Sequence, residues 1–233
     1  TISWFSAGVS SAVATKLMVD EIDRIIYIHI DDQHIDTLRF VNDCENWFGK
    51  PIEILESPHK NVETACLASA YINGPRGAPC TKILKRRVRK EWELLQSEAI
   101  RYVWGMDCDE TDRADGLRKS MPDQEHIFPL IDRKIGKTHA HKILKSSGVK
   151  RPAMYDLGYG NNNCIGCVRG GMAYWNKIRK DFPNVFQARI KMERLIEATC
   201  INGVYLDELD KDRGRQESPI IAECGIFCES LKL

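Results

Sequence analysis

The sequence predicts an α/β protein built on a doubly wound parallel sheet. Its 233 residues suffice for one such domain with a full hydrophobic core. Short apolar runs alternate with helix-like segments through the first 150 residues, which is the pattern of repeated βαβ units. One run, IIYIHI at 25–30, is continuously apolar, as is typical of a strand buried on both faces of a parallel sheet.

The elements of the first half follow one another as strand and helix. ISWF at 2–5 predicts a strand, and the serines that follow it open a helix over 10–20. After the strand at 25–30, apolar residues at helical spacing predict a helix over 34–48 that ends at Gly49. The remaining predicted elements are a strand at 51–55, a basic helix at 80–97, a strand at 101–106 and a helix at 138–148. Right-handed crossovers between such strands give a parallel sheet.

The regular alternation fades beyond about residue 150. Residues 151–233 are rich in Gly, Asn and Cys. We expect residues 1–150 to form the main α/β domain and residues 151–233 to form an irregular, Cys-rich region that folds onto the same domain.

Composition narrows the classes of function. Thirty-four Lys and Arg against 33 Asp and Glu give a net charge of +1, so no overall field draws the chain to nucleic acid or to a membrane. No apolar stretch is long enough to span a bilayer, and the N-terminus resembles a core strand rather than a signal peptide. We therefore expect a cytoplasmic protein without a membrane partner. In a reducing compartment, nine cysteines point to metal or thiol chemistry rather than to disulfides.

The turn after the first predicted strand, SAGVSS at 6–11, is a candidate anion site. In a doubly wound sheet, ligands bind at the carboxyl ends of strands, where this turn is expected to lie. The backbone N–H groups of a helix start attract anions, and a serine-rich turn that only caps the helix is the alternative. The candidate donors are Ser6, Gly8, Ser10 and Ser11. Neither G-x-x-x-x-G-K-[ST] nor G-x-G-x-x-G occurs, so this phosphate loop would be of another type.

This turn resembles the PP-loop of the adenine nucleotide α-hydrolase-like superfamily, usually S-G-G-x-D-S. Ala7 stands in place of the second-position glycine and Ser10 in place of the aspartate. In members that adenylate substrates, this aspartate helps to manage Mg²⁺ and pyrophosphate, so its absence favours members that do not cleave ATP. The resemblance implies a Rossmann-like fold in which residues 1–150 are the PP-loop nucleotide-binding domain.

Further stretches resemble the phosphoadenosine phosphosulfate (PAPS) reductases, in collinear order across nearly the whole chain. They are DDQHIDTLRFVNDCENWFGKPIEIL at 31–55, CTKILKRR at 80–87, VWGMDCDETDRA at 103–114, FPLID at 128–132, RPAMYDLGYGNNNCIGC at 151–167 and ECGIF at 223–227. The chain departs from the family at Met106 and Asp107, where a basic residue is usual. The resemblance implies a sulfonucleotide reductase-like oxidoreductase of sulfur metabolism that acts on PAPS or adenylyl sulfate.

The resemblance also implies a catalytic nucleophile, Cys224. In the reductases, the matching cysteine attacks the sulfur of the nucleotide's sulfate group, which leaves an S-sulfocysteine and releases the nucleotide monophosphate. Thioredoxin or glutaredoxin then liberates sulfite, so either is an expected partner. Phe227 replaces the family's histidine and Cys228 follows it, so CGIFC also fits a resolving pair or further metal ligands.

Nucleotide contacts are expected from several further residues. Cationic side chains must offset the charges of sulfate and phosphate, and the candidates are Lys85, Arg86, Arg113 and Arg169. Gly105 belongs to the matched stretch 103–114. Asp31 and Asp32 follow the second predicted strand, and we expect one to contact ribose or adenine and the other to cap the next helix. Most of the basic run KRRVRK at 85–90 is expected to be solvated surface.

Three cysteines are candidate metal ligands. Cys164 and Cys167 form a C-x-x-C pair in a Gly/Asn-rich turn, which lets two thiolates reach one metal centre. Cys80 begins a predicted helix, whose dipole lowers the pKa of a thiol at its start. Because adenylyl-sulfate reductases bind [4Fe–4S] with similar motifs, the resemblance implies that these three hold an iron–sulfur cluster, with zinc as the alternative.

The fourth ligand is open, because Thr81 replaces the second cysteine of the family's pair. The candidates are Cys224, Cys228, Cys108, an exogenous thiolate or sulfide, or none. The remaining cysteines, Cys44, Cys66 and Cys200, are expected to be buried small hydrophobes.

Two other classes of function stay open. One is an ATP-dependent iron–sulfur sulfurtransferase that acts on nucleic acid, with the PP-loop adenylating its target. Ser10 and ECGIF favour the reductase, whereas Thr81, Phe227 and the Met106–Asp107 pair favour the sulfurtransferase. The other is a nucleotide-sensing module without catalysis. A homodimer is compatible with all three.

Overall fold

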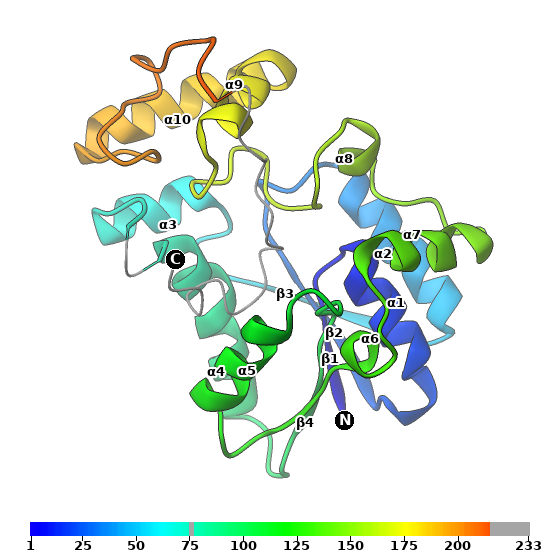
Figure 1. Cartoon of the computed structure of the whole chain (residues 1–233). Coiled ribbons are helices and arrows are strands. Elements are labelled where there is room, and N and C mark those ends of the chain that lie inside the picture. Colours follow the sequence, from blue (N-terminus) through cyan, green and yellow to red (C-terminus); the bar gives the residue numbers. More distant parts are fainter. Residues whose placement is uncertain (75–76, 215–233) are drawn as a thin grey trace.

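The computed structural model describes residues 1–74 and 77–214 (Figure 1). Within these ranges, one five-stranded sheet has the order β3-β2-β1-β4-β5, and all neighbouring strands are parallel. The strands are β1 (Ile2–Phe5), β2 (Arg24–His29), β3 (Ile52–Glu56), β4 (Arg101–Val103) and β5 (Glu125–Ile127). The predicted α/β class with a parallel sheet is confirmed, and the strand order is compatible with Rossmann-like double winding.

Helices cover both faces of this sheet (Figure 1). On one side lie α1 (Val9–Leu17), α2 (Asp36–Phe48), α6 (Pro129–Asp132) and α7 (Lys137–Ser146), with a 3₁₀ turn, η1 (Val19–Glu21), after α1. On the other side lie α4 (Arg87–Glu93) and α5 (Thr111–Ser120). The predicted helix over 80–97 is divided, because Thr81–Arg86 forms a π-helical segment, η2, and α4 ends at Glu93.

The two faces of the strands pack into separate cores, since successive side chains of a strand point to opposite sides. Phe5 and Tyr27 belong to the core under α1 and α2, whereas Trp4 and Ile26 belong to the core that contains Trp92 of α4. Both faces of the central strands are therefore buried, as the continuous apolar runs predict.

A third core joins the C-terminal part to the carboxyl end of the sheet. It combines residues between Ile30 and Leu84, including those of α3 (Val62–Ser69), with residues between Met154 and Leu209. The helices α8 (Ala153–Asp156), α9 (Met172–Asp181) and α10 (Pro183–Ile196) lie beyond the strand ends in Figure 1. This cluster brings the C-x-x-C motif to the edge of the sheet where the turn at 6–11 lies.

The predicted irregularity of the region after residue 150 is only partly right. Residues 157–171 are turns and loops, but α9 and α10 are regular helices. Pro183 at the first position of α10 is a helix-start signal that the Gly, Asn and Cys content of the region obscured. Among the described residues, no helix is both long and apolar enough to cross a membrane.

Candidate functional site

The turn at 6–11 lies at the carboxyl end of β1, beside the point where the strand order reverses between β1 and β4. Ala7 is fully buried with a φ of +57°, a left-handed conformation that glycine adopts more easily than other residues. The side-chain amide of Asn162 donates to the Ala7 carbonyl over 2.8 Å and supports this strained position. Asn162, in the loop that precedes the C-x-x-C motif, therefore stabilises the conformation of the turn.

Hydrogen bonds fix the turn internally, and Ser10 and Ser11 are buried residues that line none of the three pockets described below. The Ser11 hydroxyl donates to the Gly8 carbonyl over 3.1 Å and accepts from the Ser6 hydroxyl over 2.8 Å. The Val9 N–H donates to the Tyr155 hydroxyl over 3.3 Å. Within the described residues, the backbone N–H groups of Ser10 and Ser11 have no hydrogen-bond partner. Unsatisfied N–H groups at a helix start suit an anion.

Gly105 lets the loop after β4 approach this turn closely. A Cβ built on Gly105 would lie 2.3 Å from the Ser11 Cα, so only glycine fits without a backbone shift. Gly105 was expected to contact the nucleotide. In the structure, its lack of a side chain makes room for the turn at 6–11 where α1 begins. The hydroxyl of Ser10, which stands in the motif's aspartate position, is buried without a hydrogen-bond partner among the described residues.

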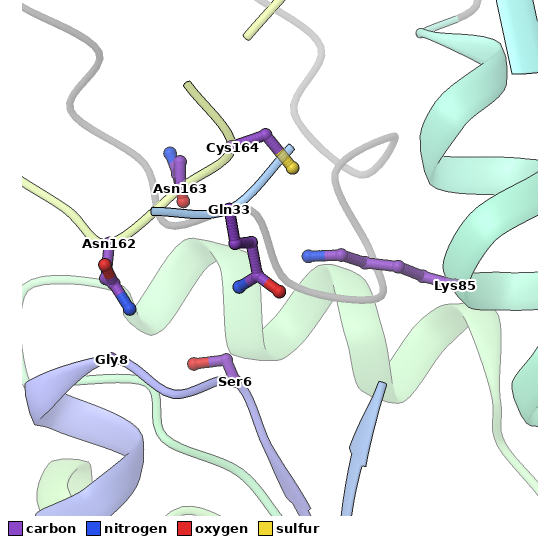
Figure 2. A pocket seen from close by; sticks show the side chains of 7 residues that line it. All are labelled: Ser6, Gly8, Gln33, Lys85, Asn162, Asn163 and Cys164. Carbon is purple, nitrogen blue, oxygen red and sulfur yellow. The ribbon is translucent and has the colours of Figure 1, made fainter. Parts of the chain in front are cut away.

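A pocket of about 280 Å³, here called the loop pocket, opens over the turn (Figure 2). It is lined by Ser6, Gly8, Gln33, Lys85, Asn162, Asn163 and Cys164. Figure 2 shows the Lys85 side chain extending from η2 toward Gln33, above Ser6. Ser6, Gly8 and Lys85 were predicted as nucleotide contacts, and the structure brings them together.

Gln33 is a lining residue that the sequence interpretation missed. Its Oε1 accepts hydrogen bonds from the Tyr27 hydroxyl over 2.5 Å and from the Ile30 N–H over 3.3 Å. Because both bonds occupy the oxygen, the amide NH₂ is the group that stays available as a donor. Burial, and the nearby Cys164, raise the pKa of Tyr27, so this phenol stays protonated and continues to donate to Gln33. The polar DDQ stretch directly after β2 was the available signal.

The other predicted cations do not line these pockets in the part of the chain that the structure describes. Arg113 is buried on α5, where it pairs with Glu110 over 2.6 Å. Arg86 belongs to η2 and Arg169 follows the C-x-x-C motif, but neither lines the three pockets described in this section. Among the predicted cations in the described residues, Lys85 lines the loop pocket.

Asp31 and Asp32 have different environments. The Asp31 carboxylate is about half exposed and lies 3.9 Å from His29 Nε2. Asp32 forms an ion pair with Arg189, which is buried, and accepts from the Val62 N–H over 2.5 Å, at the first residue of α3. Asp32 therefore accepts a hydrogen bond from the start of α3, whose N-cap is Asn61, and the expectation that one of the two aspartates caps the next helix, α2, is wrong.

The C-x-x-C turn is held by long-range contacts. The backbone carbonyl of Asp32 accepts from the Ile165 N–H over 2.8 Å, and Arg189 Nε donates to the Gly166 carbonyl over 3.2 Å. The Tyr174 hydroxyl accepts from the Cys167 N–H over 2.8 Å and donates to the Cys164 carbonyl over 3.2 Å. These contacts hold both thiols in a fixed backbone frame.

A second pocket, of about 310 Å³ and here called the thiol pocket, adjoins the first. It is lined by Ile30, Val62, Cys80, Thr81, Leu84, Lys85, Cys164, Cys167 and Val168. The three predicted metal ligands therefore line one pocket, which shares Lys85 and Cys164 with the loop pocket. A third pocket of about 260 Å³, lined in part by Asn161 and Tyr159, also reaches Cys164.

The thiol pocket fits a thiolate-bound group in ligand type and location. Three thiols are donors that iron–sulfur clusters and zinc both accept, and the buried Thr81 hydroxyl beside them has no hydrogen-bond partner among the described residues. In the described ranges, no three or more His, Cys, Asp or Glu side chains lie close enough together to hold one metal ion.

The other cysteines separate by burial. Cys44, Cys66 and Cys200 are buried in apolar clusters, as expected, and burial raises the pKa of the Cys66 thiol to about 12. Cys108 is partly exposed beside Asp109 and Gly136, and it lines none of the three pockets. Cys224 and Cys228 lie outside the described residues.

We compared the chain with protein-family models and with curated proteins. No family model matches the chain, and no curated protein matches it. The class defined by fold and site is thus an α/β protein with a five-stranded parallel sheet in the described ranges, an anion-suited turn and an adjoining thiol-lined pocket.

Proposed function

We propose that this protein is a sulfonucleotide reductase-like enzyme that binds PAPS or adenylyl sulfate through the turn at 6–11. The observation that carries the proposal is that the loop pocket and the thiol pocket share Lys85 and Cys164. An anion at the turn would therefore lie next to a group of cysteine thiols. Sulfur chemistry on an anionic nucleotide needs this proximity.

Binding of the sulfate or phosphate end is supported by three kinds of donor. The N–H groups of Ser10 and Ser11 contribute backbone donors at the start of α1. Lys85 contributes a positive charge, and the Gln33 NH₂ group contributes a neutral donor. Together they would offset the negative charge that the nucleotide monophosphate carries as a leaving group.

The proposed reaction uses the thiolate of Cys224. Its sulfur attacks the sulfur of the sulfonucleotide, a new S–S bond forms, and the bond from that sulfur to the phosphate oxygen breaks. The nucleotide leaves as AMP or as adenosine 3′,5′-bisphosphate. A thioredoxin or glutaredoxin dithiol then reduces the S-sulfocysteine by two electrons, which releases sulfite and restores the thiol.

Cys80, Cys164 and Cys167 would hold the accompanying group, an iron–sulfur cluster with zinc as the alternative. When bound, a cluster would supply a redox-active, sulfur-rich surface beside the nucleotide's anionic end. The protein's own part is to fix the C-x-x-C backbone through Tyr174 and Arg189.

An ATP-dependent sulfurtransferase acting on nucleic acid is the second candidate. The presence of Thr81 in the thiol pocket favours it, because only three of the pocket's lining residues are cysteines. In that case a thiolate-bound group with one open position would carry the sulfur, and the turn at 6–11 would bind ATP. Ser10, in place of the aspartate that manages Mg²⁺, argues for the reductase.

Sulfite release from PAPS and adenylyl sulfate, with thioredoxin or glutaredoxin as donor, tests the reductase. Cys224→Ser should reduce the release to background while the affinity for the nucleotide stays nearly unchanged. Cys228→Ser tests the alternative in which the second thiol of CGIFC takes part, and it should keep most of the activity if Cys224 alone is the nucleophile. Unchanged turnover in Cys224→Ser contradicts this role, and ATP-dependent thiolation of RNA or DNA without sulfite release establishes the sulfurtransferase instead.

A further inference from the structure

The hydroxyl of Thr81 is an unsatisfied polar group in the thiol pocket. Thr81 is only 1 % exposed, and its Oγ1 has no hydrogen-bond partner among the described residues. A hydroxyl buried without a partner loses its hydrogen bonds to water and gains none in the protein, which costs stability. Threonine in a helix usually avoids this cost by bonding to a carbonyl of the preceding turn, which Thr81 does not do.

The surroundings of Thr81 offer few acceptors. The remaining lining of the pocket consists of apolar side chains, the three thiols and Lys85, whose ammonium only donates. The Ala78 carbonyl, which lies one turn back, already accepts from the Thr81 N–H over 3.2 Å. The natural acceptor is therefore a sulfur or another electron-rich atom of a group bound in the pocket.

The local backbone places Cys80 and Thr81 at the pocket together. Thr81 is the first residue of η2, and π-helical segments occur frequently at functional sites. Cys80 precedes it directly and Lys85 lines both pockets, so one short segment contributes Cys80, Thr81 and Lys85 to the walls of the two pockets.

We propose that the Thr81 hydroxyl donates a hydrogen bond to a sulfur of an iron–sulfur cluster held by Cys80, Cys164 and Cys167. This inference rests on the cluster of the proposed function. Hydrogen bonds to cluster sulfurs stabilise the more negative, reduced state, so Thr81 raises the reduction potential. Since a hydroxyl is a poor iron ligand compared with a thiolate, Thr81 acts as a hydrogen-bond donor to the cluster rather than as its fourth ligand.

Thr81→Val tests this role, because valine has the shape of threonine and lacks only the hydroxyl. In the cluster-free protein, no hydrogen bond is lost, so the free energy of unfolding should stay the same or rise. In the anaerobically purified protein, iron and sulfide content should be retained, and the reduction potential from an EPR-monitored titration should shift to a more negative value. Thr81→Ser restores a hydroxyl and should return the potential toward that of the wild type.

The outcomes distinguish failure of this inference from failure of the cluster itself. Wild-type protein that contains zinc alone, or no metal, overturns the cluster and the inference together. A cluster whose potential and EPR signal are identical in Thr81→Val and wild type overturns only the inference. Loss of stability in cluster-free Thr81→Val would show that the hydroxyl has a protein partner, and would also overturn it.

Discussion

The loop pocket and the thiol pocket adjoin each other but are built in different ways. The loop pocket combines Ser6 and Gly8 of the turn at 6–11 with the polar side chains of Gln33, Lys85, Asn162 and Asn163. The thiol pocket is assembled from side chains that follow β2, begin α3, form η2 and surround the C-x-x-C motif. The loop pocket therefore depends in part on the backbone conformation of one turn, whereas the thiol pocket depends mainly on the contacts that hold its segments together.

Loss of the Arg189–Asp32 ion pair should have the largest effect on stability. Arg189→Met leaves the partly buried Asp32 without its counter-charge and removes the support of the C-x-x-C turn, which should cost about 3–5 kcal/mol of unfolding free energy. Arg194→Met is the control, since its pair with Asp207 is exposed and should be worth about 0–1 kcal/mol. Urea denaturation measures both, and equal costs would contradict the bracing role.

Gly105→Ala should have the second largest effect, because it disturbs the turn at 6–11. The added methyl group would meet the backbone of Ser11 rather than a flexible side chain, so we expect a loss of about 1–3 kcal/mol in stability and weaker nucleotide binding. Gly136→Ala is the control, because its Cβ would meet nothing nearer than the Cys108 sulfur at 3.4 Å. Calorimetric titration with adenylyl sulfate compares the two, and undiminished affinity in Gly105→Ala would show that the turn does not bind the nucleotide.

Lys85→Met should weaken the binding of a sulfonucleotide by about tenfold, or about 1.4 kcal/mol, and make the remaining affinity less dependent on salt. Lys82→Met, on the exposed side of the same π-helical segment, should change little. If both variants lose affinity equally, the charge acts through the general field of the basic run and not at the pocket.

Ser6→Ala should have the smallest effect. The Ser6 hydroxyl bonds to Ser11 and lines the loop pocket, so its loss should reduce nucleotide affinity several-fold while the free energy of unfolding falls by less than about 1 kcal/mol. Binding and denaturation measured on the same preparation separate the two effects. A stability loss that exceeds the binding loss would favour the helix-cap interpretation of this turn.

The sheet was predictable from the sequence because its central strands are continuous apolar runs. The predicted strands at 2–5, 25–30 and 51–55 differ from β1, β2 and β3 by no more than one residue at either end. The strand predicted at 101–106 ends at Val103, since the following residues turn toward Ser11. The short β5 was missed because EHI carries only one strongly apolar residue.

The candidate site was predictable only where its residues are neighbours in the sequence. The turn at 6–11 and the C-x-x-C motif are local patterns, and the structure brings them to adjoining pockets. The pairing of Asp32 with Arg189 links positions 157 residues apart, and no local pattern signals it. The orientation of Gln33 likewise depends on Tyr27, which lies on the strand before it.

The central claim is that nucleotide and thiol-bound group occupy adjoining pockets of one site. Its most direct test is the visible spectrum of the anaerobically purified protein, recorded with iron, sulfide and zinc analysis before and after addition of PAPS, adenylyl sulfate or ATP. The account predicts iron and sulfide in the proportions of a [4Fe–4S] cluster and a spectrum that changes with a sulfonucleotide. A response to ATP alone would favour the sulfurtransferase, and a spectrum that none of the three nucleotides changes, or zinc in place of iron, would contradict the claim.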